Sequence, residues 1–468
     1  MTETISIQHT RTALYRVQNP ATGIVVEEFP TASDADVTAA LASAHGAYLA
    51  WREVPILERA RLVSRVGELF AERAEELAAI ITEEMGKLPQ EARGELGLVT
   101  EIFDYYATEG PALAADQPIK AIGGGRAVIQ KRPVGALLGI MPWNYPYYQV
   151  ARFAAPNLVL GNTIILKHAP NCPRSALAMQ RIFDDAGLPP GAYVNVFATN
   201  GQVADIIADP RVQGVSLTGS ERAGAAVAEI AGRNLKKVVL ELGGSDPLIV
   251  LDSADIAATA RIAFRARMSN SGQACNSPKR MIVTGDIYDG FVAELTAQAA
   301  ALCPGNPADA GTNFAPLASP AAAAQLLAQI QDAVDKGATL HTGGSYLDEA
   351  GSLVAPTILT GVTPGMRAYS EELFGPVAVV YRVDGDEEAG ALANDSEYGL
   401  GAAVFSADID RAQRIADRLD AGMVSINQPG GSSAELPFGG VKRSGVGREL
   451  GPLGMDEFVN KKLLYIAG

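Results

Sequence analysis

The sequence contains few cysteines and few histidines. Its 468 residues include 3 cysteines, at Cys172, Cys275 and Cys303, and 4 scattered histidines. So few cysteines exclude a disulfide-stabilised extracellular fold and favour a reducing compartment, so we expect a cytoplasmic protein. The histidines lack the paired spacing of metal ligands, and no metal site is predicted.

Long apolar runs and an excess of positive charge are also absent. No apolar stretch is long enough to span a bilayer, and residues 1–17 lack the apolar run of a secretory signal, so no membrane partner is expected. The net charge is -15, from 38 basic and 53 acidic residues. An acidic surface repels phosphate backbones, which excludes a nucleic-acid partner.

The apolar pattern predicts helices first, and then an alternation of strands and helices. Short apolar runs alternate with helical stretches from residue 133 onward, which predicts a doubly wound parallel sheet. A second alternating set follows Glu241 and contains Cys275, so we expect two α/β domains. The early helices are expected at 34–51, 58–85 and 89–106. The strands of the first sheet are expected at 135–140, 163–166, 193–197, 212–217 and 237–240. The helices between these strands are expected at 147–160, 173–186, 202–208 and 221–232.

Residues 121–132 predict two short strands around a glycine turn at Gly123–Gly125. The three glycines resemble a phosphate-binding loop, but no helix follows them. A hairpin is therefore the better prediction.

The residues around Cys275 are small and polar. Asn270, Ser271 and Gly272 precede it, and Asn276 follows it. A cysteine is a nucleophile only as a thiolate, and this segment predicts an open loop with room for a substrate. A buried structural cysteine is the alternative, and the loop alone does not decide between them.

Three predicted strand ends carry side chains suited to chemistry. Open α/β sheets bind ligands at the carboxyl ends of their strands. Asn144 follows the first strand, and its amide can donate to an oxyanion. Lys167 ends the second strand, and Gly219 and Ser220 open a helix whose N-terminus favours phosphate. The alternatives are helix caps for Asn144 and Ser220 and a solvated side chain for Lys167.

Two carboxylates lie next to flexible or aromatic residues. Glu241 ends a strand before Gly243 and Gly244, where a carboxylate can act as a general base towards water. Glu372 lies two residues before Phe374, a pair suited to a ribose and a flat ring. Surface or helix-end charges are the alternatives for both.

Together, and in this order, these motifs are highly specific. From about residue 18 to residue 458 the chain resembles the aldehyde dehydrogenase superfamily, and it is most similar to the bacterial NAD(P)-dependent succinate-semialdehyde dehydrogenases. The motifs that carry the resemblance are Pro142-Trp143-Asn144, Lys167-His168-Ala169-Pro170-Asn171, Thr218-Gly219-Ser220, Glu241-Leu242-Gly243-Gly244, Gly272-Gln273-Ala274-Cys275, Glu372-Leu373-Phe374-Gly375-Pro376 and the segment from Pro437 to Gly445.

The resemblance implies an α/β fold of two doubly wound parallel-sheet domains with a small β oligomerisation arm. It implies a dinucleotide-binding domain at residues 1–115 and 133–243, and a catalytic domain at 244–435. The arm would be residues 116–132 and 455–468, and the assembly a homodimer or homotetramer. The exposed strand edge of such an arm is most easily satisfied by a second subunit.

The resemblance also implies the chemistry: an aldehyde is oxidised to a carboxylate with NADP or NAD. Cys275 would attack the aldehyde carbon, Asn144 and the Cys275 N–H would stabilise the oxyanion, and Glu241 would activate water to hydrolyse the thioester. Because members that pass the acyl group to coenzyme A generally lack this carboxylate, Glu241 favours hydrolysis. The cofactor-binding positions implied are Ile140, Pro142, Trp143, Lys167, Pro170, Gly219, Ser220, Leu242, Glu372 and Phe374.

The cofactor preference is predicted from Pro170. Many NAD-preferring relatives carry a glutamate at this position, which holds the ribose and repels a 2′-phosphate. Proline offers neither charge nor hydrogen bond, while Lys167, His168 and Arg174 lie nearby in the sequence. We therefore expect NADP to be accepted.

The predicted substrate, succinate semialdehyde, ends in a carboxylate, and its pocket therefore calls for a cation. Arg152 matches the arginine that holds this carboxylate in the resembled enzymes, whereas a second arginine of some members is Ser269 here. Ser432 or Ser433 is expected to supply a hydroxyl instead. The alternative for Arg152 is a residue on the helix surface that pairs with an acid. Tyr148, with Tyr145 and Tyr147, favours the alternative of an aromatic or longer aliphatic aldehyde.

Two further hypotheses belong to other classes. A non-catalytic relative that kept the fold would not need Cys275, Glu241 and Asn144 together. A thiol hydrolase without a cofactor would need a histidine near Cys275, and no histidine has an evident role.

Overall fold

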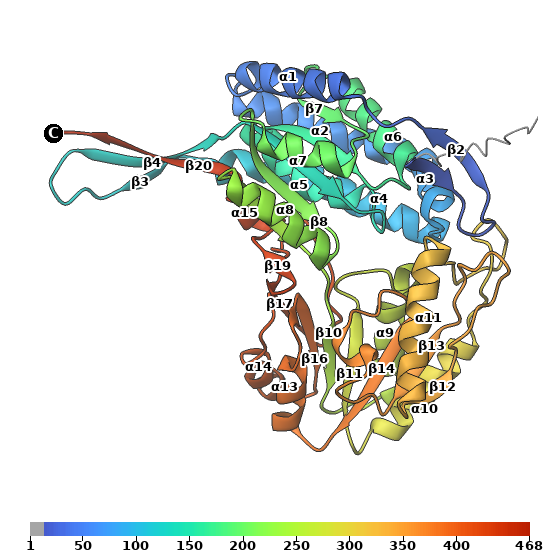
Figure 1. The fold of residues 1–468 in the computed structure, drawn as a ribbon. Helices are drawn as coiled ribbons and strands as arrows, with labels where there is room; N and C mark the ends of the chain where they lie inside the picture. The colour runs from blue at the N-terminus through green and yellow to red at the C-terminus, as the bar shows by residue number, and fades with distance from the viewer. Residues whose placement is uncertain (1–13) are drawn as a thin grey trace, which may run out of the picture.

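The computed structural model describes residues 14–468. Residues 1–13, the start of the predicted dinucleotide-binding domain, and His9 among them, lie outside the described part. Figure 1 shows two lobes, one above the other, and a narrow β arm that projects from the upper lobe. No helix in residues 14–468 is long and apolar enough to cross a membrane.

The upper lobe is built on a six-stranded sheet with the order β19-β9-β8-β5-β6-β7. All neighbours are parallel except the edge strand β19, which runs antiparallel to β9. The predicted doubly wound sheet is therefore confirmed. Its strands are β5 (Ala136–Met141), β6 (Thr163–His168), β7 (Tyr193–Asn195), β8 (Val212–Thr218), β9 (Lys237–Glu241) and β19 (Gly445–Val446).

Helices cover both faces of this sheet. The single helix expected at 58–85 is two helices, because the chain leaves helical geometry at Arg73 with φ -105° and ψ 16°. Gly86 ends the second of them in the left-handed conformation, which glycine adopts without strain. The helices of the lobe are α1 (Asp34–Trp51), α2 (Ile56–Glu72), α3 (Ala74–Met85), α4 (Pro89–Leu113), α5 (Tyr148–Leu160), α6 (Pro173–Asp185), α7 (Asn200–Ala208) and α8 (Glu221–Arg233).

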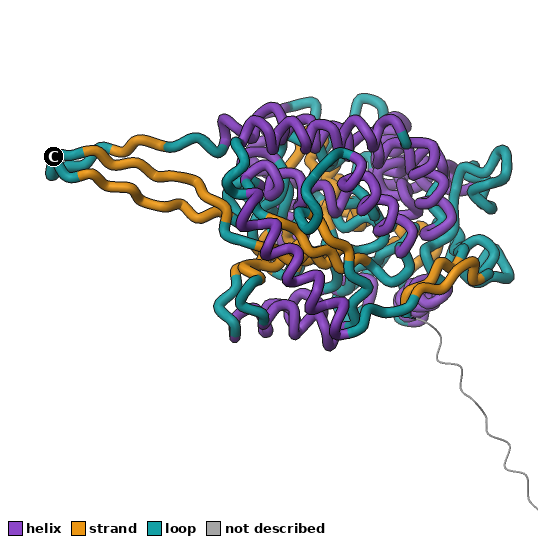
Figure 2. The backbone as a smooth tube through the Cα atoms, turned by 90° about the horizontal axis from the view of Figure 1, so that it is seen from above, coloured by secondary structure: helices purple, strands orange, loops and turns teal. Residues whose placement is uncertain are grey.

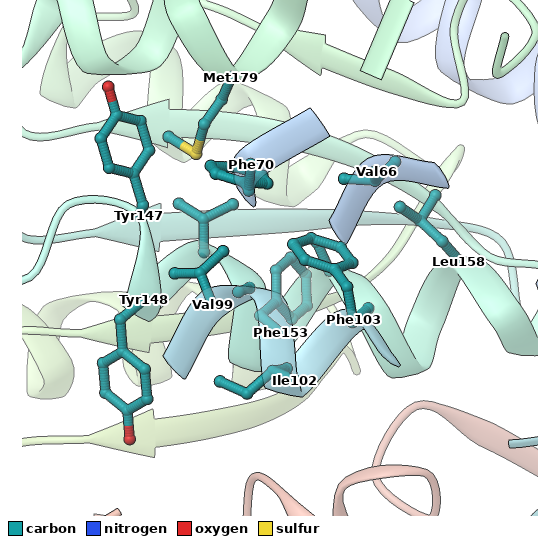
Figure 3. Close-up of a cluster of buried hydrophobic side chains, with 14 of the residues drawn as sticks. Val66, Phe70, Val99, Ile102, Phe103, Tyr147, Tyr148, Phe153, Leu158 and Met179 are labelled. Carbon is teal, nitrogen blue, oxygen red and sulfur yellow. The ribbon is translucent and has the colours of Figure 1, made fainter. Parts of the chain in front are cut away.

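Aromatic and aliphatic side chains from α2, α4 and α5 fill the core of this lobe (Figure 3). The Phe70 ring stacks on Phe103 at a centroid distance of 5.6 Å and meets Tyr147 edge-on at 5.7 Å. Burial of each such ring contributes about 1.5–3 kcal/mol. Tyr147 and Tyr148 both belong to this core, but their side chains point in opposite directions in Figure 3.

The lower lobe has a seven-stranded sheet with the order β12-β13-β14-β11-β10-β16-β17, parallel except for β12. The second predicted α/β unit is therefore present. Its strands are β10 (Asp246–Val250), β11 (Pro278–Thr284), β12 (Thr339–Thr342), β13 (Thr357–Thr360), β14 (Val377–Val383), β16 (Gly401–Phe405) and β17 (Met423–Ile426), and its helices are α9 (Ile256–Met268), the 3-10 turn η1 (Ser269–Gly272), α10 (Tyr288–Ala300), α11 (Pro320–Asp335), α12 (Arg367–Ser370), α13 (Asp386–Asn394) and α14 (Ile409–Ala416).

The arm is a three-stranded antiparallel sheet of β3 (Gln117–Ile119), β4 (Arg126–Pro133) and β20 (Val459–Ile466). The predicted hairpin is therefore present, and the C-terminal strand pairs with β4 along its full length. Figures 1 and 2 show the arm extending well beyond the lobes. The remaining short elements are β1 (Tyr15–Gln18), β2 (Val25–Phe29), β15 (Tyr398–Gly399), β18 (Val441–Lys442) and α15 (Gly451–Gly454).

Candidate active site

Two cavities meet at Cys275, between the lobes. The first cavity has a volume of about 440 Å³ and the second a volume of about 420 Å³, and both are lined by Gln149 and Cys275. The predicted residues that line the first cavity are Pro142, Trp143, Asn144, Gly219, Ser220, Leu242, Glu372 and Phe374. The predicted residues that line the second cavity are Tyr145, Tyr148, Ser269 and Ser432.

The two sheets present opposite ends to this space. The upper sheet contributes residues that follow its strands, whereas Cys275 lies three residues before β11 begins at Pro278. Phe374 likewise lies three residues before β14 begins at Val377. Since β11 and β14 are parallel neighbours, their amino ends bring the Cys275 and Phe374 loops together.

The loop that carries Cys275 has an unusual backbone. Asn270, Ser271 and Gly272 are consecutive left-handed residues, with φ of 52°, 53° and 73°. The conformation is strained at the two residues that have side chains. A Cβ at Gly272 would lie 2.3 Å from the Gly375 carbonyl oxygen, so only glycine fits there.

The buried side chain of Arg267 holds the loop in this conformation. Its guanidinium donates to the carbonyl oxygen of Gly272 at 3.1 Å and to the Ser277 hydroxyl at 2.6 Å. It also donates to the carbonyl oxygens of Leu373 and Val377, both at 2.7 Å. Arg267 therefore ties the Cys275 loop to the Glu372–Phe374 loop.

The thiol of Cys275 is the side chain that both cavities share. Burial raises its pKa to about 12, while the charges of Arg152 and Lys279 act in the opposite direction. Cys172 is buried in the upper lobe and Cys303 is exposed. Of the three thiols, Cys275 alone combines partial exposure with two adjoining cavities.

Asn144 contacts the Cys275 loop directly. Its Nδ2 donates to the Gln273 carbonyl oxygen at 3.0 Å, and the Asn270 amide donates to the Asn144 carbonyl oxygen at 3.0 Å. An amide nitrogen carries two hydrogens, so one N–H remains for a ligand in the cavity. The sequence-predicted pair of Asn144 and Cys275 is therefore brought together.

Glu241 is buried behind the first cavity and does not line it. Among the described residues, neither of its carboxylate oxygens has a hydrogen-bond partner. Burial raises the pKa of this carboxyl well above its usual range, with the charge of Arg152 opposing the shift. A Cβ at Gly439 would lie 2.7 Å from Glu241 Oε1, so the carboxyl faces Gly439 in this conformation.

The first cavity fits a nicotinamide dinucleotide. Helix α8 points its N-terminus into it, and the Ser220 hydroxyl caps the helix by accepting from the Ala223 N–H at 3.4 Å. Such a terminus provides backbone donors for a diphosphate. A Cβ at Gly243 would lie 2.6 Å from Glu372 Oε2, so this carboxylate packs closely on the strand end, at a position suited to ribose hydroxyls.

Ile140, Lys167 and Pro170 do not line the first cavity. Ile140 pairs in register with Lys167 on one side and with Leu217 on the other, which places the three strand ends side by side. Lys167 is 8% exposed, and burial alone lowers the pKa of its ammonium to about 8. Pro170 is half-buried, and its carbonyl accepts from the Arg16 N–H at 3.0 Å.

The other two cations expected near the cofactor are not available. The ring of His168 is fully buried, and burial lowers its pKa to about 4, so it is neutral near pH 7. Arg174 forms ion pairs with Glu27 and Glu83. Lys167 is therefore the only one of the three whose charge remains for a phosphate.

The second cavity has an aromatic wall and no basic side chain among its lining residues. Tyr145, Tyr148 and Phe438 line it, whereas Tyr147 packs into the core. Ser432 lines the cavity and Ser433 does not, which corrects the expectation for Ser433. Ser269 lies at the edge, where its hydroxyl donates to Glu91 Oε1 at 3.3 Å.

Arg152 lies behind this wall and lines neither cavity. Its Nε is 2.9 Å from Glu449 Oε2, and the Arg152 side chain is fully buried. The guanidinium carbon lies 4.8 Å from the Tyr148 ring centroid and 4.5 Å from that of Phe438. The expected direct clamp is therefore replaced by an ion pair, with the Tyr148 hydroxyl 3.4 Å from Arg152 Nη1.

Several residues of the site were not predicted from the sequence. Arg267, Lys279 and Glu449 are charged residues that lie in ordinary amphipathic or glycine-rich contexts, and only the folded chain places them at the site. The sequence predicts Tyr145 and Tyr148 at the pocket, but it does not show that Tyr147 turns away from them.

The comparisons with known proteins agree with this geometry. The model of the Aldehyde dehydrogenase family matches residues 7–464. A succinate-semialdehyde dehydrogenase [NADP(+)] of Deinococcus radiodurans is 56% identical over 446 residues, which cover 95% of this chain and 93% of that protein. One of Mycolicibacterium paratuberculosis is 44% identical, covering 96% of each chain. The crystal structure of succinic semialdehyde dehydrogenase from Streptococcus pyogenes with NADP+ has a TM-score of 0.95 at 42% identity, covering 97% of this chain and 100% of that one.

Proposed function

This chain belongs to the aldehyde dehydrogenase family, and we propose that it oxidises succinate semialdehyde to succinate with NADP. The observation that carries the proposal is the position of Cys275, where a cavity suited to a dinucleotide meets a second cavity suited to an aldehyde. The structure of the related Streptococcus pyogenes enzyme with NADP+ supports the choice of cofactor.

Cys275 begins the reaction by attacking the aldehyde carbon as a thiolate. The free N–H of the Asn144 amide and the Cys275 backbone N–H donate to the oxyanion that forms, which stabilises the charge where it develops. The residues that would hold NADP are the α8 N-terminus with Ser220, Glu372 at a ribose and Lys167 at the 2′-phosphate. When bound, NADP supplies an acceptor for the hydride that leaves the aldehyde carbon. A thioester on Cys275 is the result.

Glu241 then removes a proton from the water that hydrolyses this thioester. The carboxyl faces Gly439 in this structure, so its side chain must rotate towards Cys275 before it acts. Since both oxygens lack partners, no hydrogen bond among the described residues opposes the rotation. Hydrolysis releases succinate and restores the thiol.

The substrate carboxylate would bind in the second cavity, at the wall that carries Ser432 and Tyr148. Ser432 and Tyr148 offer hydroxyl donors on the cavity wall. Arg152 contributes its positive charge from behind Tyr148, and its Nη1 polarises the Tyr148 hydroxyl at 3.4 Å. The aromatic wall also favours a second candidate, an aromatic or longer aliphatic aldehyde, which would gain nothing from Arg152.

The stoichiometry of the products tests the proposed reaction. We expect one succinate and one NADPH for each semialdehyde consumed, measured by proton NMR and by absorbance. Cys275→Ser, which keeps the size and removes the thiolate, is expected to abolish both products. Succinate formation without NADPH, or without Cys275, would contradict the proposal.

NADP preference is expected to depend on Lys167 and on pH. A protonated lysine attracts the 2′-phosphate, so the advantage of NADP over NAD is present below the Lys167 pKa of about 8 and decreases as pH rises through it. Calorimetric titration with each cofactor measures this ratio. Lys167→Gln is expected to lower NADP affinity by about tenfold and to leave NAD affinity within about twofold. An NADP advantage that persists in Lys167→Gln would contradict this role.

The arm supports a proposal of a homodimer or homotetramer. Leu463 and Tyr465 on β20 are 60% and 49% exposed, on a strand that projects from the lobes. A second subunit would cover both the apolar side chains and the strand edge. Sedimentation of the intact chain measures the assembly, and a monomer would contradict it. The three free cysteines support a cytoplasmic location.

A further inference from the structure

Lys279 lies at the start of β11 and touches both halves of the site. Its side chain is 1% exposed. Nζ donates to the carbonyl oxygen of Ala274 at 2.7 Å and to that of Cys275 at 2.6 Å. The same Nζ lies 3.0 Å from Glu372 Oε1. One buried ammonium therefore contacts the backbone of the nucleophile and the carboxylate that lines the cofactor cavity.

Glu372 is held in turn by the connection between the two sheets. Its Oε1 accepts from the Gly244 N–H at 3.1 Å, three residues after β9 ends at Glu241 and two residues before β10 begins at Asp246. Lys279 thus contacts the Cys275 loop and the carboxylate of Glu372, which the connection between the two sheets also holds. All three hydrogen-bonding directions of its ammonium are used within the described residues.

We propose that Lys279 is a positioning residue that couples the cofactor side of the site to the nucleophile, by fixing the Cys275 backbone and stabilising its thiolate while it holds Glu372 in place. The inference rests on the proposed roles of Cys275 and Glu372. In this proposal Lys279 controls both the reactivity of the Cys275 thiol and the position of the Glu372 carboxylate.

The charges around the thiol determine the direction in which each substitution shifts the pKa of Cys275. The positive charge of Lys279 lowers the pKa of Cys275, and the negative charge of Glu372 raises it. Removal of Lys279 must therefore make Cys275 less reactive, and removal of the Glu372 charge must make it more reactive. A residue that acted only as a structural support would not produce opposite shifts.

The test is alkylation of the cofactor-free protein by iodoacetamide between about pH 6 and 13, a range that includes the Cys275 pKa of about 12, read by mass spectrometry at each cysteine peptide. In Lys279→Met, the midpoint of the Cys275 pH profile is expected to rise, and the rate near neutral pH to fall by about tenfold. The exposed Cys303 is an internal control whose rate stays unchanged. A Cys275 profile that keeps its midpoint, even if all rates fall together, would overturn the proposal.

Glu372→Gln gives the complementary result and does not require removal of the buried lysine. Its Cys275 midpoint is expected to fall, with a rate near neutral pH several-fold above that of the unsubstituted protein. A midpoint that rises or stays constant would overturn the proposal, even if Lys279→Met does not fold. Because alkylation needs neither aldehyde nor cofactor, these results stay interpretable if semialdehyde oxidation itself is disproved.

Titration of NADP into Lys279→Met tests the other half of the coupling. We expect NADP affinity to fall several-fold, because Glu372 loses the cation that holds it. Lys279→Arg, which keeps the charge, is expected to retain more of this affinity than Lys279→Met. Equal NADP affinity in Lys279→Met and the unsubstituted protein would overturn the coupling.

Discussion

Glu241→Gln is expected to stop turnover after a single equivalent of NADPH per active site. Hydride loss does not need this carboxylate, whereas hydrolysis of the thioester needs a base that removes a proton from water. We expect steady-state kcat to fall by about 10³-fold, while the first turnover stays fast. Rapid-mixing absorbance measures the burst, and mass spectrometry of the quenched protein is expected to find a succinyl group on Cys275.

The pH dependence of turnover follows from the same residue. Burial raises the Glu241 pKa well above the usual range of a glutamate, and the base works only when ionised. The kcat is therefore expected to fall as pH decreases through this raised pKa, at a higher pH than an exposed glutamate would give. Glu241→Asp shortens the side chain and keeps the ionisation, so it is the matched control. A Glu241→Gln enzyme that turns over repeatedly at the normal rate would contradict the role of Glu241.

Removal of the Arg152 charge is expected to abolish the preference of the enzyme for succinate semialdehyde over an aldehyde without a carboxylate. A direct charge-assisted contact is worth roughly 1.5–3 kcal/mol, which corresponds to about 10- to 150-fold in kcat/KM, and Arg152 acts only through the Tyr148 hydroxyl. Arg152→Gln is therefore expected to lower kcat/KM for succinate semialdehyde by about tenfold, at the low end of this range. Its kcat/KM for butanal, which has the same chain length and no carboxylate, is expected to stay within about threefold.

Loss of Arg152 also leaves Glu449 buried without its ion-pair partner, which costs about 3–5 kcal/mol of stability. Glu449→Gln breaks the same ion pair and keeps the cation, so it separates stability from recognition. We expect both variants to lower the melting temperature and only Arg152→Gln to lose selectivity. If Arg152→Gln and Glu449→Gln have the same selectivity for succinate semialdehyde over butanal, the Arg152 charge does not contribute to substrate binding.

Much of this fold follows from local patterns in the sequence. The strand that ends at Met141 and the helix that opens at Glu221 both lie within one residue of their predicted bounds, because apolar period and glycine turns decide such elements locally. The resemblance to the aldehyde dehydrogenase family, carried by the motifs around Asn144, Glu241 and Cys275, is confirmed by the match over residues 7–464.

The site itself was predictable only in part. The rule that ligands bind at carboxyl ends of strands located Asn144 and Ser220, but Cys275 lies at an amino end of the lower sheet. The position of Cys275 opposite the upper sheet depends on how the two lobes face each other. It therefore cannot be predicted from a local sequence pattern. The roles predicted for the individual site residues remain predictions.

The ion pair of Arg152 with Glu449 is a contact that local sequence patterns cannot predict. The two residues are nearly 300 positions apart in the sequence, and their ion pair depends on the chain returning to the upper sheet through β19. The sequence therefore predicts a role for the Arg152 cation in the substrate pocket, but not the carboxylate that holds it behind Tyr148. Lys279 was missed for the same reason, since its partner Glu372 comes from a distant loop.

The most direct test of the account is the ratio of kcat/KM for succinate semialdehyde to that for butanal, with NADP and the unsubstituted protein. We predict a ratio of at least about 10, because only the semialdehyde presents a carboxylate to Ser432, Tyr148 and the charge of Arg152. A ratio near one, or a preference for benzaldehyde over both, would contradict the assigned substrate and favour the aromatic wall as the determinant of specificity.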